Sequence, residues 1–378
     1  MKKVMIVFGT RPEAIKMAPL CHLMKTQSDF ETIVCVTGQH RQMLDQVLRT
    51  FDLQPDIDLN VMKENQDLFD VTSAILIGMK KVFSDYKPDL VLIHGDTTTA
   101  FSTALAAFYS GVPVGHVEAG LRTNNLRAPF PEEFNRKVSG LVSSIHFAPT
   151  ATSKANLLKE GVESDDISVT GNTVVDALLW MLDKLENDDE RKSYNTEFIS
   201  KYLPFDFRNE KYVLITGHRR ENFGDGFVNI CTAIKELASK YHDVHFVYPV
   251  HLNPKVRGPV IEILAGKSNI HLIEPLGYEP FVWLLKHCYI VLTDSGGIQE
   301  EAPSLGKPVL VMRDVTERPE AVLAGTVQLV GTSKRGVFES IDRLLLEDDV
   351  HQTMAGLINP YGDGKACEKI LAIIRDKL

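Results

Sequence analysis

The chain has 378 residues, of which 44% are hydrophobic and 24% are charged. These proportions are typical of a globular protein large enough for two domains. The net charge is −9 and basic blocks interleaved with aromatic residues are missing, which argues against a nucleic-acid-binding protein. The five cysteines are scattered and no apolar run approaches a membrane span, so we exclude a disulfide framework and expect a cytoplasmic protein.

The first half of the chain alternates predicted strands with predicted helices. An apolar strand is expected over Lys3–Phe8, followed by a turn at Gly9 and a helix that ends near Lys25. Thr10 and Glu13 at the start of this helix have the spacing of a capping box. Further strands are expected over residues 33–37, 89–96 and 112–117, and further helices over residues 67–86 and 97–109. This alternation predicts a parallel, doubly wound α/β sheet.

The second half repeats the same alternation after a helix expected over Val174–Leu185. The stretch Glu186–Glu210 is charged and has no strand pattern, and we place the junction between two domains there. Counted with the helix before the junction, the second domain covers residues 173–363 and the first covers residues 1–172. The last helix, residues 364–378, is expected to pack back on the first domain. Strands of the second domain are expected over residues 212–216, 244–249, 270–273, 289–293, 308–312 and 326–329.

The stretch Tyr289–Met312 has the pattern of a nucleotide-binding element. A buried strand is followed by the Ser295–Gly297 turn, a short helix and a second buried strand. Adjacent glycines allow backbone N–H groups to approach a ligand closely, and a helix start favours phosphate. The carboxylates of Glu300 and Glu301 are placed to accept hydrogen bonds from a ribose diol. We predict a sugar-nucleotide diphosphate site, with a plain strand–turn–helix connection as the alternative.

Polar side chains gather where the predicted strands end. Ligands of open parallel sheets bind at the carboxyl ends of the strands, so these side chains are candidates for a site in a cleft between the two domains. A further acid, Glu132, is expected in a loop held by Pro129 and Pro131. Several acids opposite cations suit acid–base chemistry on a sugar ring with a phosphate leaving group, because crowded acids raise one another's pKa. The strand ends supply Arg11, Lys16, Asp96 and Glu118 in the first domain, and His218, Arg219 and Ser295–Gly297 in the second.

Structural alternatives stay open for several of these residues. Asp96 precedes Thr97 and has the position of a helix N-cap, and His218 has the alternative of an exposed histidine without a role. Phe281 is a candidate to stack on a uracil, and core packing is its alternative. The pair Asp56 and Asp58 matches a metal-binding motif of sugar transferases, but it follows a proline at an edge-like stretch, so we reject it as a metal site.

Seven blocks, in order along nearly the whole chain, resemble the non-hydrolysing UDP-N-acetylglucosamine 2-epimerases of bacteria. They are GTRPEAIKMAP (9–19), HGDT (94–97), HVEAGLR (116–122), FPEEFNR (130–136), TGHRREN (216–222), TDSGGIQEE (293–301) and TERPE (316–320). The resemblance implies two Rossmann-like domains facing a cleft, as in glycosyltransferases of the B type, with UDP held mainly by the second. It implies interconversion of UDP-GlcNAc and UDP-ManNAc through a 2-acetamidoglucal, without a metal ion or another cofactor, in the supply of cell-surface polysaccharide.

The resemblance also assigns roles to residues and implies a homodimer, which we expect to form through first-domain helices such as residues 67–86. Asp96, Glu118 and Glu132 match the acid–base carboxylates of the family, and His218 matches its essential histidine near the diphosphate. Residues that match nucleotide contacts are Arg11, Lys16, Ser295, Gly296, Gly297 and Glu301, and the segment Gln39, His40, Arg41 and Gln42 is similar to the loop of a pocket where UDP-GlcNAc acts as activator.

Three other functions share features with this reading. A hydrolysing 2-epimerase would perform the same elimination, admit water to the glycal and release ManNAc and UDP. A retaining glycosyltransferase would use the same scaffold, but it needs an acceptor groove and has no need of three converging acids. A regulator that only binds a sugar nucleotide has no use for the acids.

Overall fold

The computed structural model describes residues 1–378 and divides into two compact units. Unit 1 comprises Met1–Trp180 and Tyr361–Leu378, and unit 2 comprises Met181–Pro360, so the division lies inside helix α7 (Thr173–Asn187). The charged stretch after this helix contains no strand but does form a helix, α8 (Asp189–Ser200), which the sequence pattern did not predict. None of the helices has the length and apolar character that crossing a membrane requires.

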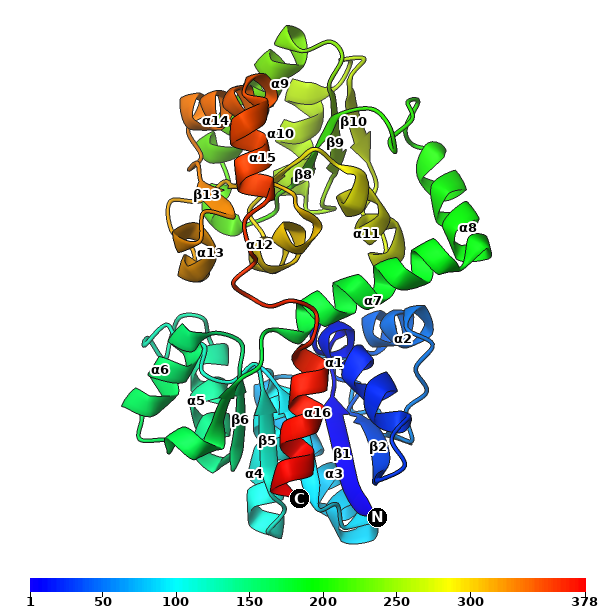
Figure 1. Cartoon of the computed structure of the whole chain (residues 1–378), viewed down its shortest axis with the longest axis vertical. Helices are drawn as coiled ribbons and strands as arrows, with labels where there is room; N and C mark the ends of the chain where they lie inside the picture. The colour runs from blue at the N-terminus through cyan, green and yellow to red at the C-terminus, as the bar shows by residue number, and fades with distance from the viewer. The chain divides into compact units, whose positions relative to one another are not determined.

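Unit 1 is built on a parallel sheet of seven strands in the order β3-β2-β1-β4-β5-β6-β7. The strands are β1 (Lys2–Phe8), β2 (Phe30–Val36), β3 (Ile57–Asp58), β4 (Leu90–His94), β5 (Val114–Val117), β6 (Ile145–Ala148) and β7 (Ile167–Val169). The helices are α1 (Arg11–Lys25), α2 (Arg41–Thr50), α3 (Leu68–Tyr86), α4 (Thr98–Ser110), α5 (Glu132–Val142), α6 (Ala151–Lys159) and α16 (Ala366–Lys377). Figure 1 shows α16, the end of the chain, lying beside α1.

The first turn of the chain follows β1, a central strand of the unit 1 sheet. Val4–Phe8 of β1 are completely buried, as expected for a parallel strand covered on both faces. A side chain at Gly9 would place its Cβ 2.0 Å from the Thr37 hydroxyl oxygen and 2.3 Å from that of Thr99. Glycine is therefore the residue that lets β1 turn into α1 against these neighbours.

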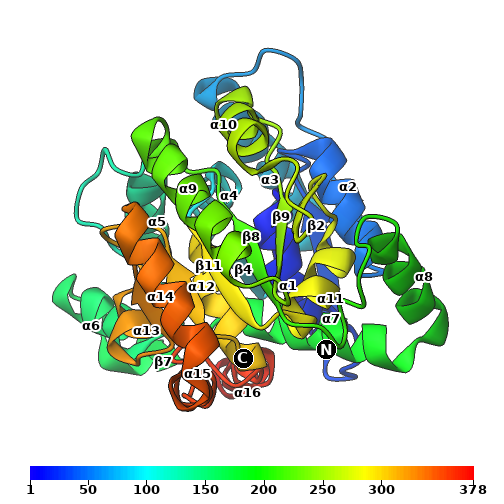
Figure 2. The same cartoon turned by 90° about the horizontal axis from the view of Figure 1, so that it is seen from above.

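Unit 2 contains a parallel sheet of six strands in the order β10-β9-β8-β11-β12-β13. The strands are β8 (Tyr212–Thr216), β9 (His245–Pro249), β10 (Ile270–Ile273), β11 (Ile290–Thr293), β12 (Val309–Val311) and β13 (Val327–Leu329). The helices are α9 (Asp225–Lys240), α10 (Pro254–Leu264), α11 (Tyr278–His287), α12 (Gly296–Glu301), α13 (Pro319–Leu323), α14 (Lys334–Leu346) and α15 (Asp348–Ala355). Figure 2 shows α14 packed beside α9 and α15.

The two sheets share one plan. Counted from the first strand of each unit, both have the order 3-2-1-4-5-6 of the doubly wound Rossmann fold, and unit 1 adds β7 at its edge. The predicted α/β class and the six strands predicted for the second half are confirmed. The strands β3, β6 and β7 were not predicted.

Candidate active site

The carboxyl ends of β1 and β4, the loop after β2 and the start of α5 enclose a cavity of about 590 Å³ in unit 1. Its lining includes Arg11, Asp96, Glu132, Gln39 and His40. Arg11 forms no ion pair within the protein, so its guanidinium is a cation available to a ligand. The cavity therefore brings together one predicted cation, two predicted acids and two residues of the predicted activator loop.

Asp96 is a cavity residue rather than a helix cap. The N-cap of α4 is Thr97, whose hydroxyl accepts a hydrogen bond from the Ala100 backbone N–H at 3.0 Å. The Asp96 carboxylate accepts a 2.5 Å bond from Arg136, and its backbone carbonyl accepts one from the Asn135 amide at 2.9 Å. Burial raises the pKa of Asp96 and the nearby Glu118 charge adds to the rise, while Arg136 opposes both.

Glu118, directly after β5, is held in a strained backbone conformation. Its φ is +63°, in the left-handed region that costs a residue with a side chain about 1 kcal/mol or more. Its Oε2 accepts hydrogen bonds from the Lys16 ammonium and, at 2.8 Å, from the Asn172 amide. The side chain is only 8% exposed, so Glu118 is fixed both by its backbone and by these two donors.

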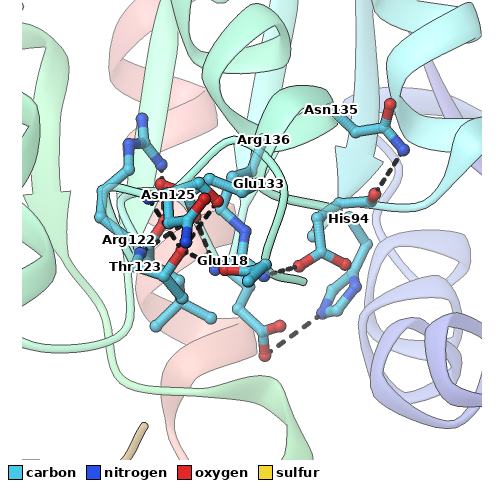
Figure 3. Close-up of polar contacts among 12 residues, drawn as sticks. His94, Glu118, Arg122, Thr123, Asn125, Glu133, Asn135 and Arg136 are labelled. Carbon is cyan, nitrogen blue, oxygen red and sulfur yellow. Dashed lines mark hydrogen bonds and ion pairs between the residues drawn. The ribbon is translucent and has the colours of Figure 1, made fainter. Parts of the chain in front are cut away.

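His94 lies beside Glu118 without neutralising it. The distance from its Nε2 to Glu118 Oε2 is 3.8 Å, as the dashed line in Figure 3 marks. Burial lowers the pKa of His94 to about 4, so the imidazole is neutral at physiological pH. The positive charge next to the Glu118 carboxylate therefore comes from Lys16.

Glu132 is the first residue of helix α5, so the prediction that it lies in a loop is wrong. Its Oε2 is buried and has no hydrogen-bond partner. The adjacent Glu133 is completely buried and accepts hydrogen bonds from the backbone N–H groups of Thr123 (3.0 Å) and Asn124 (2.8 Å), so it ties the preceding loop to the helix (Figure 3). This anchoring fixes where α5 starts and therefore where Glu132 lies at the cavity.

Glu13 confirms the predicted contact from α1 back to the first turn. Its carboxylate accepts hydrogen bonds from the backbone N–H groups of Gly9 (3.0 Å) and Thr10 (2.8 Å), and from the Thr97 hydroxyl at 2.7 Å. Glu13 is 1% exposed, and burial raises its pKa to about 7. Glu13 therefore connects the turn after β1 with the start of α4. Arg11 lies next to the first of these two places and Asp96 next to the second.

The segment Gln39–Gln42 contributes to the cavity in part. The side-chain oxygen of Gln39 accepts hydrogen bonds from the Thr99 hydroxyl at 2.9 Å and the Thr99 N–H at 3.3 Å. His40 is exposed and lines the cavity, whereas Gln42 is exposed and does not. Gln39 therefore anchors the loop to α4, and His40 is the member of the segment placed to meet a ligand.

In unit 2, His218 and Arg219 form the turn after β8. Both backbone N–H groups donate 2.8 Å hydrogen bonds to Oδ2 of Asp294, which was not among the predicted site residues. The His218 side chain is 49% exposed and stacks on His251, with ring centroids 5.2 Å apart. Burial of the other half of the ring lowers the pKa of His218.

The Ser295–Gly297 turn leaves open space at the start of α12. Neither glycine has a positive φ, so their role is to leave room rather than to permit a left-handed turn. A Cβ on Gly297 would meet no atom within 4 Å, and one on Gly296 would lie 3.6 Å from the Arg318 guanidinium carbon and 3.7 Å from an Arg219 nitrogen. Two guanidinium groups therefore approach the space beside this turn.

Two further acids of unit 2 differ in their burial. Glu300 is 1% exposed and forms a 2.5 Å ion pair with Arg318, so the prediction that it meets a ribose is wrong. Glu301 is only partly buried. Phe281, on α11, is also partly buried, so both alternatives stay open for it. Asp56 and Asp58 are ion-paired with Lys25 and Arg41.

Comparison with known proteins agrees with this arrangement. Residues 22–375 match the family model described as UDP-N-acetylglucosamine 2-epimerase. The chain is 56% identical to the UDP-N-acetylglucosamine 2-epimerase of Campylobacter jejuni over 99% of this chain and 97% of the relative. It is also 56% identical to that of Escherichia coli (strain K12), over 99% and 98%.

Solved structures extend the comparison to three dimensions. The UDP-GlcNAc 2-epimerase of Neisseria meningitidis bound to UDP-GlcNAc superimposes with a TM-score of 0.88 at 52% identity, covering 99% of this chain and 100% of that one. A glycosyltransferase of Rickettsia africae, at 15% identity and a TM-score of 0.62 over 99% and 98%, shares the fold alone. The sheets therefore belong to a fold of the glycosyltransferase B type. The chain is a member of the UDP-N-acetylglucosamine 2-epimerase family, whose members are isomerases.

Proposed function

We propose that this protein interconverts UDP-GlcNAc and UDP-ManNAc by reversible epimerisation at C2, without net hydrolysis. Relatives that match over nearly their full length are named UDP-N-acetylglucosamine 2-epimerase, and one relative was solved with UDP-GlcNAc bound. The observation that carries the proposal is the cavity at the sheet edge of unit 1, where Arg11 faces Asp96 and Glu132 and where Glu118 is held close to Asp96.

The chemistry explains why several acids are needed. The C2 proton of UDP-GlcNAc is not acidic, so its removal requires a well-placed base and weakening of the bond between C1 and the diphosphate oxygen. Loss of the proton and of UDP forms a C1–C2 double bond, which gives a 2-acetamidoglucal. A proton delivered to the opposite face of C2, with return of the UDP oxygen to C1, completes the epimerisation.

Unit 1 supplies the proton-transfer groups in this proposal. We assign Glu118 and Asp96 to positions nearest C2, because both are fixed by cationic partners and neither serves the fold as a cap. The raised pKa of Asp96 means that this carboxyl holds a proton more readily than an ordinary aspartate does, as suits a proton-transfer group. Glu132 is the third acid, and its buried, unpartnered oxygen is free to accept a proton or a hydrogen bond from the sugar.

Unit 2 supplies the UDP contacts in this proposal. The open space beside Gly296 lies next to the Arg219 and Arg318 guanidinium groups, which favour an anion. His218 follows β8 at the same edge of the sheet, where its imidazole can donate to the leaving diphosphate. The proposed partners of the remaining parts of UDP are Glu301 for the ribose, Phe281 for the uracil and the Ser295–Gly297 turn for phosphate, with Arg11 and Lys16 acting from unit 1.

The test of the non-hydrolysing proposal is a time course of UDP-GlcNAc incubated with the protein, resolved by anion-exchange chromatography. We expect UDP-ManNAc to accumulate to a constant ratio while the sum of the two UDP-sugars stays constant. Steady conversion to free ManNAc and UDP would identify a hydrolysing 2-epimerase. The UDP-ManNAc formed would supply ManNAc-type sugars for cell-surface polysaccharide.

The proposed assembly is a homodimer formed through helices of unit 1. A mostly apolar groove of about 470 Å³ is lined by Leu68 and Phe69 on α3, by Phe130 before α5 and by Phe134 on α5, and Phe69 is 83% exposed. Exposed apolar surface of this kind favours association. Light scattering coupled to size-exclusion chromatography should give twice the 42.2 kDa of one chain, and Phe69→Ser should shift the protein towards one copy.

Regulation by substrate is a separate proposal that rests on His40. Its side chain lines the cavity that contains Arg11, so a second molecule of UDP-GlcNAc beside the first would meet it. Sigmoidal dependence of the rate on UDP-GlcNAc, lost in His40→Ala, would support activation, and a hyperbolic curve in the unaltered protein would contradict it. Gln39 and Gln42 complete the proposed loop.

A further inference from the structure

We propose that Asp294 is the positioning residue for His218, orienting its imidazole so that Nδ1–H faces Asp294 and Nε2 is left for an oxygen of the diphosphate. This inference deepens the proposed function, because it assumes that His218 acts on the leaving UDP. All the residues that carry it belong to unit 2.

One oxygen of the Asp294 carboxylate binds the backbone of the turn that contains His218. Asp294 is completely buried, directly after β11. Its Oδ2 accepts hydrogen bonds from the backbone N–H groups of His218 and Arg219 at 2.8 Å each, and from the Asn222 amide at 3.3 Å. Since β8 and β11 are paired neighbours, the acid reaches across the sheet edge to fix this turn.

The second oxygen of Asp294 has no partner of its own. Oδ1 is buried without a hydrogen bond, and it lies 3.8 Å from Nδ1 of the His218 ring. An unpaired oxygen of a buried carboxylate costs free energy unless a donor approaches it. A small rotation of the half-exposed imidazole brings Nδ1–H to this oxygen, so the protein holds the acceptor in place for one orientation of His218.

Three charged or titratable groups face His218, and they act in opposite directions. Burial of the ring disfavours the imidazolium, the Asp294 carboxylate favours it, and His251 and Arg219 disfavour it. His251 stacks on the ring and Arg219 follows it in the chain. Asp294 is therefore the group that keeps an imidazolium attainable when the diphosphate anion meets Nε2.

The most direct test is NMR of His218 in the full-length protein labelled at histidine ring carbons and nitrogens, with its signals assigned by their loss in His218→Asn. We expect the Nδ1–H tautomer in the neutral state. In Asp294→Asn, whose amide oxygen can still accept from the two backbone N–H groups, the pKa of His218 should fall by about one unit. The matched control is Asp243→Asn, an exposed aspartate on the same unit, which should leave the pKa unchanged.

Steady-state kinetics can show whether Asp294 positions His218 or only stabilises the fold. Asp294→Asn should lower kcat about 10-fold or more with little change in KM, and should shift the histidine limb of the pH–rate profile to lower pH. In the His218→Asn background the same substitution should have little further effect, because the residue that it positions is already gone.

The inference is overturned by an Nε2–H tautomer in the unaltered protein, a result that does not depend on whether Asp294→Asn folds. It is equally overturned by an unchanged His218 pKa in a folded Asp294→Asn protein, or by equal losses of kcat with and without His218. The titration needs no substrate, so it tests Asp294 even if UDP-GlcNAc is not epimerised. A failure to epimerise UDP-GlcNAc would contradict the proposed function instead.

Discussion

The two units share a strand order, and the turn after the first strand is built in parallel ways. In unit 1 the turn contains Gly9 and Arg11, and in unit 2 it contains Gly217 and Arg219, so each has glycine and arginine two positions apart. In each unit one buried carboxylate accepts two backbone N–H groups of the turn. In unit 1 this acid is Glu13 from the helix that follows, whereas in unit 2 it is Asp294 from the neighbouring strand.

This difference determines what each sheet edge offers to a ligand. Because Glu13 already holds the turn of unit 1, Asp96 after β4 is free to line the cavity. The acid at the corresponding strand end of unit 2, Asp294, is buried under the turn, and the groups left at the surface are His218 and Arg219. Unit 1 therefore presents acids together with Arg11, and unit 2 presents His218 and Arg219, a combination that elimination of an anionic leaving group would use.

We expect the largest loss of activity from the replacement of Glu118, one of the acids of unit 1. Glu118→Gln keeps an acceptor for Lys16 and Asn172 but removes the ability to take a proton. We expect kcat to fall by about 10³-fold or more, measured as UDP-ManNAc formation, with UDP binding unchanged. Glu64→Gln, an exposed glutamate on the same unit, should keep full activity, and full activity of Glu118→Gln would refute its proton-transfer role.

Asp96→Asn should lower kcat by about 10²-fold. Because its pKa is raised, the acidic limb of the wild-type pH–rate profile that reports on Asp96 should lie above the range of an ordinary aspartate. Activity should fall as pH drops through that limb if Asp96 acts as a base, and rise if it acts as an acid. A profile identical in shape in the variant would show that Asp96 does not titrate in the reaction.

On the cation side, Arg219→Ala should weaken UDP binding by about 10- to 100-fold, since charge-assisted hydrogen bonds contribute roughly 1.5–3 kcal/mol. Isothermal titration calorimetry measures this directly. Arg220→Ala is the matched control, because the adjacent arginine is exposed and forms no ion pair within the protein. Equal losses in the two variants would mean that only overall charge matters.

The last prediction concerns stability, at the Glu13 turn. The pKa of Glu13 is about 7 in the fold against an ordinary value of 4.5, so the folded protein binds this proton more tightly than the unfolded chain does. Stability should therefore decrease as pH rises from 4.5 to 7, by about 3 kcal/mol at most, and this contribution should be missing in Glu13→Gln. Denaturant unfolding of the unaltered protein and of Glu13→Gln at pH 5 and pH 8 measures how the free energy of unfolding of each changes with pH. An equal change in the two proteins would contradict the raised pKa of Glu13.

Prediction from sequence succeeded where patterns are local. The strands of unit 2 are apolar runs bounded by turn residues, and the Glu13 contact is made three residues from its partner, so both were visible in the sequence. The acids Asp96 and Glu118 stand out because they follow buried strands. In contrast, helix α8 lacks an apolar stripe, and the start of α5 was hidden by the prolines around Glu132.

Residues that act through distant partners could not be predicted. Asp294 and His218 are 76 positions apart, and Arg136 and Asp96 are 40 apart. Both pairs lie inside blocks that the resemblance identified, yet no spacing within a block shows which side chains meet. Asn172 donates a hydrogen bond to Glu118, which is 54 positions away, and it belongs to none of the motifs found in the sequence. Sheet topology, rather than local spacing, creates these contacts.

In the proposed mechanism, the carboxylates of unit 1 exchange the proton at C2 while UDP leaves and returns. This exchange can be observed by proton NMR of UDP-GlcNAc incubated with the protein in D2O, without added metal ion or nicotinamide. We predict a mixture of UDP-GlcNAc and UDP-ManNAc, both carrying deuterium at C2, and no exchange with Glu118→Gln. UDP-ManNAc that retains protium at C2, or an unchanged substrate, would contradict the account.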